Sequence, residues 1–246
     1  MIELTNVRYA YAGRRVLENM SLRLPDGCVT AVIGPNGAGK STALRLMAGL
    51  FRPEFGSVRV DGIDPSASPR WETARRIAFL PQERPVPALT VEELAAHGRY
   101  AYHPGSGRLT PADRDAVCRA LALTGMEHLR TRDLRSLSGG QRQKAYLAMA
   151  IAQDTCNLVL DEPFVHLDIG FQLELCRLLD RLAWEGCCVC VVMHDLPLVP
   201  RLCGRVALID RGCARFVGTP QGCFQSAAFE RAFGVRLAQT PGYTFE

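Results

Sequence analysis

A glycine-rich loop between an apolar run and a helical pattern constrains this chain more than any other feature. Residues 34–41 read Gly-Pro-Asn-Gly-Ala-Gly-Lys-Ser, which matches the pattern G-x-x-x-x-G-K-[ST] without a mismatch. The apolar run of residues 29–33 precedes the loop, and residues 40–50 carry apolar side chains at helical spacing. This order of strand, loop and helix predicts a phosphate-binding loop at the end of a buried strand.

Each residue type in the loop suits phosphate binding. Glycines allow the backbone to wrap around phosphates and to point its N–H groups inward. We expect Lys40 to neutralise the β- and γ-phosphates and the Ser41 hydroxyl to bind Mg²⁺. The helix that begins at Lys40 adds the positive end of its dipole. The predicted nucleotide-binding residues are Gly34, Pro35, Asn36, Gly37, Ala38, Gly39, Lys40, Ser41 and Thr42.

A second apolar run ends in two carboxylates. Residues 158–160 read Leu-Val-Leu and are followed by Asp161 and Glu162. We expect Asp161 to reach the Mg²⁺ shell, and Glu162 to polarise the attacking water as a general base. A strand end with two solvated acids is the alternative, and the phosphate loop upstream makes the catalytic interpretation the stronger one.

Two more polar residues follow predicted strands. His194 comes directly after the apolar run of residues 189–193, and Gln82 follows the short strand at residues 77–80. Strand ends in a parallel sheet share one edge, so we expect His194 to contact the γ-phosphate. We expect Gln82 to reach Mg²⁺ or the attacking water. A structural histidine and a solvated turn glutamine are the alternatives.

The pattern along the chain predicts an α/β fold with a phosphate-loop core and an inserted helical lobe. Strands that alternate with helices favour a mostly parallel sheet, with an N-terminal antiparallel β subdomain. Helical patterns at residues 90–97, 110–123 and 138–152 favour the lobe. We therefore expect a single domain over residues 1–246. Its parts are a core at 1–83 and 153–220, a helical lobe at 84–152 and a tail at 221–246.

Composition narrows the functional classes. No apolar run approaches 18 residues, so we expect no transmembrane helix, and the first residues lack the plan of a signal peptide. The net charge is +4 and the basic residues are scattered, which gives a nucleic-acid-binding function little support. Among the ten cysteines, no two CxxC pairs stand at zinc spacing. Cys187, Cys188 and Cys190 lie in an apolar run, where we expect small buried hydrophobes rather than metal or redox groups.

Residues 137–141 read Leu-Ser-Gly-Gly-Gln, and with the motifs above they resemble the nucleotide-binding domain of ATP-binding cassette (ABC) transporters over about residues 2–220. The resemblance implies a head-to-tail dimer that binds ATP and Mg²⁺ between its two copies. In that dimer the signature residues Leu137, Ser138, Gly139, Gly140 and Gln141 would act in trans on the partner's nucleotide.

The same resemblance assigns three further roles. Tyr11 matches the aromatic position that stacks on adenine, with Tyr9 as the alternative. Asp168 ends the loop that communicates across the dimer, although Phe164, Val165 and His166 depart from the usual family sequence there. The lobe and Gln82 match the region that couples ATP to a permease.

Among subfamilies, the chain most resembles the ATPases of bacterial importers for iron–siderophore complexes, haem and cobalamin. The resemblance rests on residues 97–100, His-Gly-Arg-Tyr, on residues 167–169, Leu-Asp-Ile, and on the length of a single cassette. It implies ATP hydrolysis at the cytoplasmic face of the cell membrane. It also implies transmembrane permease subunits as partners, a second copy of the ATPase, and, indirectly, an extracytoplasmic substrate-binding protein. A soluble cassette ATPase and a small-molecule kinase are the alternatives; a kinase has no use for a signature that acts in trans.

Overall fold

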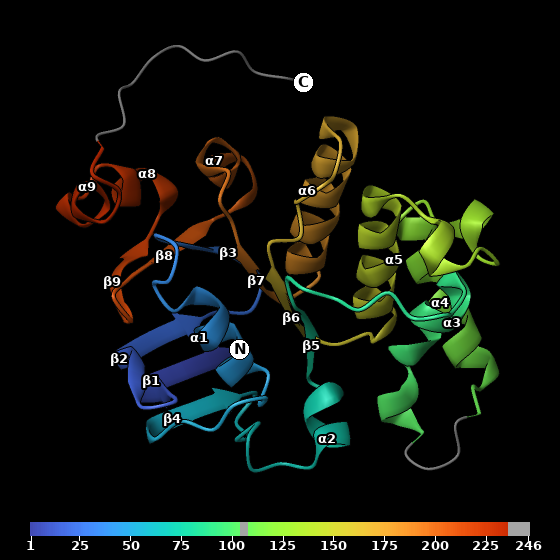
Figure 1. The fold of residues 1–246 in the computed structure, drawn as a ribbon, viewed down its shortest axis with the longest axis horizontal. Helices are drawn as coiled ribbons and strands as arrows, with labels where there is room; N and C mark the ends of the chain where they lie inside the picture. The colour runs from blue at the N-terminus through green and yellow to red at the C-terminus, as the bar shows by residue number, and fades with distance from the viewer. Residues whose placement is uncertain (104–107, 236–246) are drawn as a thin grey trace.

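Two β-sheets and a lobe of helices make up the fold, which a computed structural model describes for residues 1–103 and 108–235 (Figure 1). The strands are β1 (Ile2–Tyr11), β2 (Arg14–Leu24), β3 (Cys28–Ile33), β4 (Phe55–Val60), β5 (Ile77–Leu80), β6 (Asn157–Asp161), β7 (Cys188–Val192), β8 (Arg205–Asp210) and β9 (Cys213–Gly218). The α-helices are α1 (Lys40–Met47), α2 (Arg70–Ala74), α3 (Val91–His97), α4 (Pro111–Leu123), α5 (Gly139–Ala152), α6 (Ile169–Trp184), α7 (Val199–Leu202), α8 (Pro220–Phe224) and α9 (Ala227–Phe233).

The larger sheet is mostly parallel, with the strand order β5-β6-β7-β3-β8-β9. Every adjacent pair from β5 to β8 is parallel, and only the β8–β9 pair is antiparallel. All residues of β6 and β7 are buried, as expected for strands that are covered on both faces. The carboxyl ends of β3, β5, β6 and β7 therefore meet at one edge of the sheet, directly after which the predicted site residues follow.

The smaller sheet is antiparallel, with the order β2-β1-β4. Its strands alternate buried apolar and exposed residues, so one face packs on the core and the other faces solvent. The buried face shares a hydrophobic cluster with α1 and with alternate residues of the parallel sheet. The predicted α/β fold with an N-terminal antiparallel sheet is confirmed.

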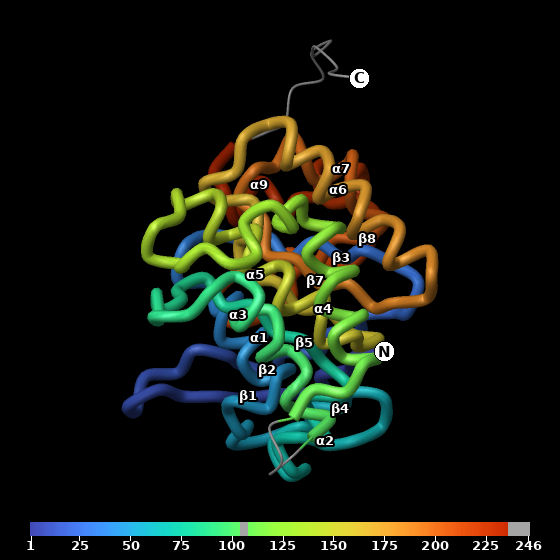
Figure 2. Tube along the Cα trace, turned by 90° about the vertical axis from the view of Figure 1, so that its right-hand side faces the viewer, coloured from blue at the N-terminus to red at the C-terminus, as the bar shows by residue number. Residues whose placement is uncertain are grey.

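The helices α3, α4 and α5 pack against one another on the far side of β5 and β6 (Figures 1 and 2). Each helix begins with a capping box. The side chains of Thr90, Thr110 and Ser138 accept a hydrogen bond from the backbone N–H of the third helical residue, and the side chain of that residue accepts one from the backbone N–H of the capping residue. A buried ion pair fixes the start of α4, because Arg99 Nε lies 2.9 Å from Asp113 Oδ1. The capping boxes are local sequence signals, which explains why the sequence alone predicts these helices.

The structure departs from the sequence expectations at several elements. The strand β9 and the helix α2 were not predicted. The β8–β9 hairpin turns at Arg211 and Gly212, which both have positive φ (48° and 72°), and an Arg-Gly pair is a weak turn signal. The tail region carries two short helices, α8 and α9. Residues 236–246 of the predicted tail lie outside the described residues.

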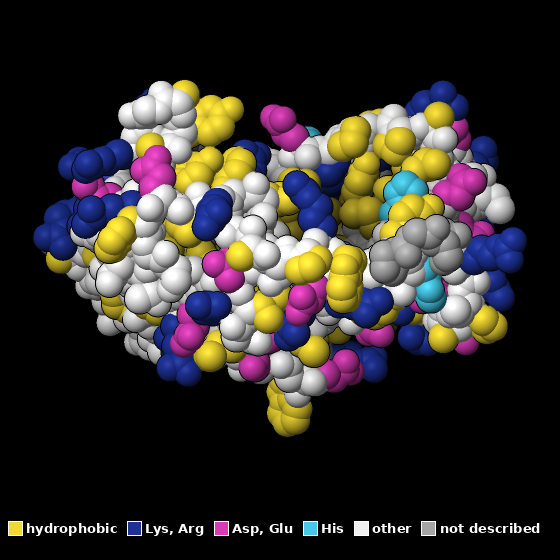
Figure 3. All heavy atoms as spheres, turned by 90° about the horizontal axis from the view of Figure 1, so that it is seen from below, with side chains coloured by type: hydrophobic (Ala, Val, Ile, Leu, Met, Phe, Trp, Pro, Cys, Tyr) yellow, Lys and Arg dark blue, Asp and Glu magenta, His cyan; other side chains and the backbone are white. Residues whose placement is uncertain are grey.

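The cysteine prediction holds for two of its three members. Cys188 and Cys190 are fully buried in β7, whereas Cys187 lies just before the strand and is only half-buried. No helix in the part of the chain that the structure describes is long and apolar enough to cross a membrane. On the face seen in Figure 3, Lys and Arg side chains are interspersed with Asp and Glu, in keeping with the scattered charge of the sequence.

Candidate nucleotide site

The glycine-rich loop connects β3 to α1 in a backbone that only glycine permits. Gly39, the residue before the helix, has a φ of 101°, and a Cβ there would lie 2.6 Å from Leu17 Cδ2. A Cβ on Gly34 would lie 1.9 Å from the carbonyl oxygen of Ile209. Close packing on both sides thus fixes the loop in front of α1.

Lys40 lies in the middle of this loop. Its side chain is buried, and its ammonium group donates to the carbonyl oxygens of Gly34 (2.8 Å) and Pro35 (2.9 Å). Burial lowers the pKa of Lys40, and the nearby carboxylates of Glu162 and Asp161 raise it. The lysine is therefore a cation held by backbone oxygens at the position where phosphates would replace them.

Asp161 ends β6 beside this lysine. It is 2% exposed, and its Oδ1 has no hydrogen-bond partner. Burial raises the pKa of Asp161; the Ser41 hydroxyl lowers it and Glu162 raises it further. An unpaired buried carboxylate is costly unless a ligand completes it.

The donors around Asp161 fit a magnesium ion. A carboxylate and the Ser41 hydroxyl are the hard oxygen ligands that Mg²⁺ prefers, and Mg²⁺ usually takes the rest of its shell from phosphates and water. Within residues 1–103 and 108–235, no three His, Cys, Asp or Glu side chains form a group that could hold a metal ion. One carboxylate and one hydroxyl supply part of such a shell, so these residues suit a cation that arrives with a nucleotide.

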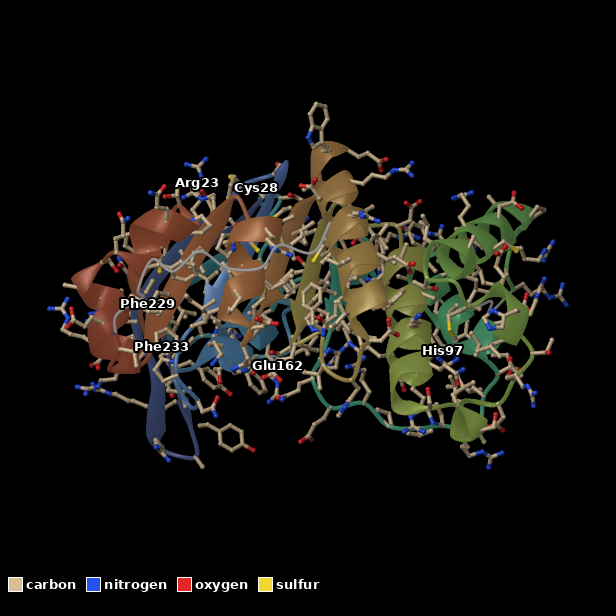
Figure 4. The ribbon with its side chains drawn as sticks, turned by 90° about the horizontal axis from the view of Figure 1, so that it is seen from above. Arg23, Cys28, His97, Glu162, Phe229 and Phe233 are labelled. Carbon is tan, nitrogen blue, oxygen red and sulfur yellow. The ribbon has the colours of Figure 1, made fainter. Side chains whose placement is uncertain are left out.

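Glu162 lies between two polar partners at the same edge. Gln82 Nε2 donates to its Oε2 at 2.8 Å, and His194 Nε2 lies 2.6 Å from its Oε1. The backbone of Glu162 has a φ of 53°, which is uncommon for a residue with a side chain and is typical of functional sites. Figure 4 shows Glu162 between the core and the lobe that carries His97. The ends of β5, β6 and β7 thus supply one hydrogen-bonded trio.

A cavity of about 390 Å³ joins the loop to this trio. It is lined by Val16, by the loop residues Asn36, Gly37, Ala38, Gly39, Lys40, Ser41 and Thr42, and by Gln82, Glu162 and His194. Ten of the twenty residues that the sequence singled out therefore line one cavity. Val16 was missed, because a valine on an antiparallel strand carries no motif.

A neighbouring cavity of about 640 Å³ shares Val16, Gly37 and Thr42 with the first. Tyr11 lines it and is 65% exposed. Tyr9 instead stacks on Phe51, with ring centroids 5.0 Å apart and an interplanar angle of 7°. Only Tyr11 therefore has a free ring face for a base.

Arg45 also lines this second cavity and lowers the pKa of Asp161. The sequence interpretation overlooked it. It lies one helical turn beyond Thr42 in α1, so helical spacing was the signal that could have found it.

The signature residues lie apart from both cavities, at the start of α5. The Ser138 hydroxyl accepts from Gln141 N at 3.3 Å, and the Gln141 side chain accepts from Ser138 N at 3.0 Å. Leu137 is buried, whereas Ser138 and Gly139 are exposed. Gly140 packs so closely that a Cβ would lie 2.9 Å from the His166 carbonyl oxygen. The start of this 14-residue helix carries the positive end of its dipole and can bind an anion.

Asp168 begins α6 and likewise lies outside both cavities. Its Oδ1 accepts from Phe171 N at 2.9 Å, so its carboxylate caps the helix. That backbone hydrogen bond lowers the pKa of Asp168. The carboxylate is therefore ionised at neutral pH, and the cap fixes the end of the loop that follows Glu162.

A buried lysine in a glycine cradle, next to an unpaired carboxylate and an oriented glutamate, can bind a nucleotide triphosphate and direct water at its last phosphate. The fold and the site thus define a phosphate-loop nucleotide hydrolase, and the exposed helix start suggests a site completed by a second molecule.

Comparison with known proteins narrows this class. The family model described as "ABC transporter" matches residues 17–165. The ferric enterobactin transport ATP-binding protein FepC of Escherichia coli K12 is 40% identical over 228 residues, which are 92% of this chain and 84% of that protein. The petrobactin import ATP-binding protein FpuC of Bacillus anthracis is 38% identical over 96% of this chain and 88% of its own. The hemin import ATP-binding protein HmuV of Pseudomonas entomophila L48 is 36% identical over 98% and 95%.

Solved structures agree with the similarity to ABC transporter ATPases. An ATP-binding subunit of an ABC transporter superposes with a TM-score of 0.82 at 25% identity, covering 97% of this chain and 95% of its own. The ATP-binding cassette MJ0796, in a dimeric post-hydrolysis state with ADP and Pi, superposes with a TM-score of 0.79 at 26% identity, covering 89% and 99%. The chain belongs to the ABC transporter family and is one of its ATPases.

Proposed function

We propose that this chain is the ATP-hydrolysing subunit of a bacterial ABC importer for iron(III)–siderophore complexes. Its likeness to the ferric enterobactin transport ATPase, at 40% identity over 92% of the chain, carries the assignment of the cargo class. The petrobactin import protein gives the same class from a second organism. The set of residues around Glu162 supports ATP hydrolysis as the energy source.

In this proposal the residues in and around the 390 Å³ cavity have separate roles in binding the nucleotide. Lys40 and the loop N–H groups bind the β- and γ-phosphates, because they are the cation and donors that face that space. Ser41 and Asp161 hold Mg²⁺, which neutralises charge on the phosphates when bound. Gln82 is a further ligand or water contact on the same rim. Tyr11 stacks on adenine in the adjoining cavity.

Glu162 acts as the general base. A base must be ionised and aimed at the water that it polarises. The amide of Gln82 and the imidazole of His194 each hold one carboxylate oxygen, which fixes its direction. His194 lines the cavity and can contact the γ-phosphate. Loss of that phosphate would therefore change the contacts of His194 and, through their hydrogen bond, those of Glu162.

The second half of the site comes from a second copy of this chain. A hydroxyl that accepts one hydrogen bond keeps its own hydrogen to donate, so Ser138 can cap α5 and still donate to a phosphate. The backbone N–H groups of Gly139 and Gly140 belong to the first turn of this helix, and the buried Leu137 and the Gln141 side chain hold that turn in place. Asp168, fixed by its cap on α6, transmits the state of one site to the other.

Permease subunits are the membrane partners in this proposal, and the chain works peripherally at the cytoplasmic face of the membrane. The core at 1–83 and 153–220 binds nucleotide, and the helical lobe at 84–152 holds the permease. An extracytoplasmic binding protein delivers the cargo indirectly. Gln82 lies at the border between core and lobe, where closure around ATP can reach the permease. Haem is the alternative cargo, favoured by the 36% identity with the hemin import protein, and cobalamin is the next.

Uptake by cells tests the cargo. Cells that lack this chain would be given labelled ferric siderophore, haem and cobalamin in separate experiments. We expect loss of ferric siderophore uptake, restored by the wild type and not by Glu162→Gln. Restoration of haem or cobalamin uptake alone would overturn the siderophore assignment and leave the ATPase intact. Equal restoration by Glu162→Gln would instead contradict ATP-driven import.

A further inference from the structure

Two cysteines lie side by side at the opposite end of the sheet from the nucleotide site. Cys156 immediately precedes β6, and Cys187 immediately precedes β7. The paired residues one step further on are Asn157 and Cys188, so the two cysteines occupy the next register position of the same parallel pair. The backbone continues the pairing there, since Cys188 N donates to the Cys156 carbonyl oxygen at 2.8 Å.

Both side chains lie on the same face of the sheet. Leu158, two residues after Cys156, belongs to the cluster that α5 and α6 cover, and Cys187 packs against that cluster. Because side chains alternate along a strand, Cys156 faces the same way as Leu158. Burial raises the pKa of Cys187, and the nearby Cys156 raises it further, which agrees with two neighbouring sulfur atoms.

The spacing suits a disulfide. Neighbouring strands lie about 4.8 Å apart, within the roughly 4.4–6.8 Å between the Cα atoms of bridged cysteines. Both residues stand just before their strands, and the backbone pairing of the two strands reaches them. We propose that Cys156 and Cys187 form an oxidisable thiol pair, converted to a disulfide by exchange with a small-molecule disulfide such as oxidised glutathione.

Access also fits this proposal. Cys156 is exposed, and the half-buried Cys187 lines a cavity of about 340 Å³ between the lobe and α6. Arg119 and Arg181 line the same cavity, although Arg181 also pairs with Glu185 at 2.9 Å. Asp154 lines the cavity as well, so its charges are balanced, and a small disulfide can approach the exposed Cys156 from solvent. The other cysteine is close enough to complete the exchange.

The exchange has two balanced steps. The Cys156 thiolate attacks one sulfur of oxidised glutathione, which forms a mixed disulfide and releases one glutathione thiolate. The Cys187 thiolate then attacks Cys156 Sγ, which forms the intramolecular bond and releases the second glutathione. The two protein thiols are oxidised, one small-molecule disulfide is reduced to two thiols, and the two protein protons end on the released glutathiones.

The disulfide would cross-link β6 and β7, which carry Asp161, Glu162 and His194 at their other ends. It closes the chain over residues 156–187 and so restricts the unfolded state. We expect the melting temperature to rise by about 5–10 °C. Dithiothreitol would reverse the change.

The full-length chain, incubated with oxidised glutathione and then alkylated, tests the proposal by mass spectrometry. We expect a loss of two hydrogen atoms and a Cys156–Cys187 linked peptide, with Cys118→Ser, an exposed cysteine on α4, behaving as the wild type. Cys156→Ser and Cys187→Ser should each abolish the link and the rise in melting temperature. A glutathione adduct that persists on Cys156 of the wild type, or a link between other cysteines in its place, would overturn the proposal.

Discussion

His194 Nε2 lies 2.6 Å from Glu162 Oε1, so the ends of β7 and β6 are joined by a side-chain hydrogen bond at the mouth of the phosphate loop. Gln82, from the end of β5, holds the other carboxylate oxygen. Three parallel strands thus orient one glutamate. The side-chain order Gln82, Glu162, His194 matches the strand order β5-β6-β7, so sheet topology alone brings the three together.

Asp161→Asn should stabilise the nucleotide-free chain while it abolishes Mg²⁺-dependent hydrolysis. Burial raises the pKa of Asp161, so the folded chain holds that proton more tightly than the unfolded chain. Ionising the carboxylate therefore costs folding free energy, and this cost grows as pH rises above the unfolded value of 3.8. We expect a gain of about 1–2 kcal/mol at pH 8. The gain should shrink at pH 4.5.

Thermal unfolding of both proteins at the two pH values, without nucleotide, checks this prediction. A variant less stable than the wild type at pH 8 would mean that the Ser41 hydroxyl and the nearby cations stabilise the carboxylate by more than its burial costs. ATPase activity measured across a Mg²⁺ titration gives the second readout, where the variant should show no recovery.

Alanine substitutions at Gly139 and Gly140 should have different effects, one on dimer formation and the other on folding. A Cβ on Gly140 would meet the His166 carbonyl oxygen at 2.9 Å, so Gly140→Ala should destabilise the single chain by about 1–3 kcal/mol. A Cβ on Gly139 would meet only His166 side-chain atoms at 3.9 Å or more. Gly139→Ala should therefore keep the melting temperature and, in the proposed dimer, lose ATP-dependent dimerisation, because the added methyl group would crowd the phosphate that the partner brings.

Melting curves and size-exclusion chromatography with ATP read out the two effects. Equal melting temperatures for the two alanine variants would contradict the packing argument. A Gly139→Ala dimer that forms at wild-type ATP concentration would contradict the contact in trans.

Tyr11 and Tyr9 should also behave differently. Tyr11→Ala removes an exposed ring, so we expect ATP affinity to fall by about 1–2 kcal/mol with little change in stability. Tyr9→Ala removes a ring stacked on Phe51, so the free energy of unfolding should fall while ATP affinity changes less. Calorimetric titration with ATP checks the affinities. A larger affinity loss for Tyr9→Ala would make Tyr9 the adenine contact.

Much of the fold could be predicted because local signals and global packing agree. The apolar run before Gly34, the capping boxes at Thr90 and Thr110, and the Leu-Val-Leu run before Asp161 each predict the element that the structure contains. The hairpin to β9 was missed because Arg211 and Gly212 give little turn signal. The short helix α2 was missed because five residues show no helical period.

The candidate site was predictable where it rests on motifs and not where it rests on tertiary contacts. Strand-end positions placed Gln82, Glu162 and His194 at one edge, whereas their mutual hydrogen bonds depend on side-chain directions that no spacing gives. Val16 enters both cavities from β2, whose sequence carries no nucleotide signal, and Arg45 lies in α1 beyond the end of the loop motif. Cys187 is only half-buried because it precedes β7 rather than belonging to the strand.

ATP hydrolysis and assembly of Glu162→Gln test the central claim most directly. The amide keeps the shape of the side chain and cannot act as a base, so we expect kcat to fall by about 10²–10⁴-fold. ATP binding should persist and trap a dimer, seen by size-exclusion chromatography with Mg²⁺–ATP. Glu54→Gln, an exposed glutamate outside both cavities, should behave as the wild type. Hydrolysis by Glu162→Gln at the wild-type rate would contradict the assignment of Glu162 as the base.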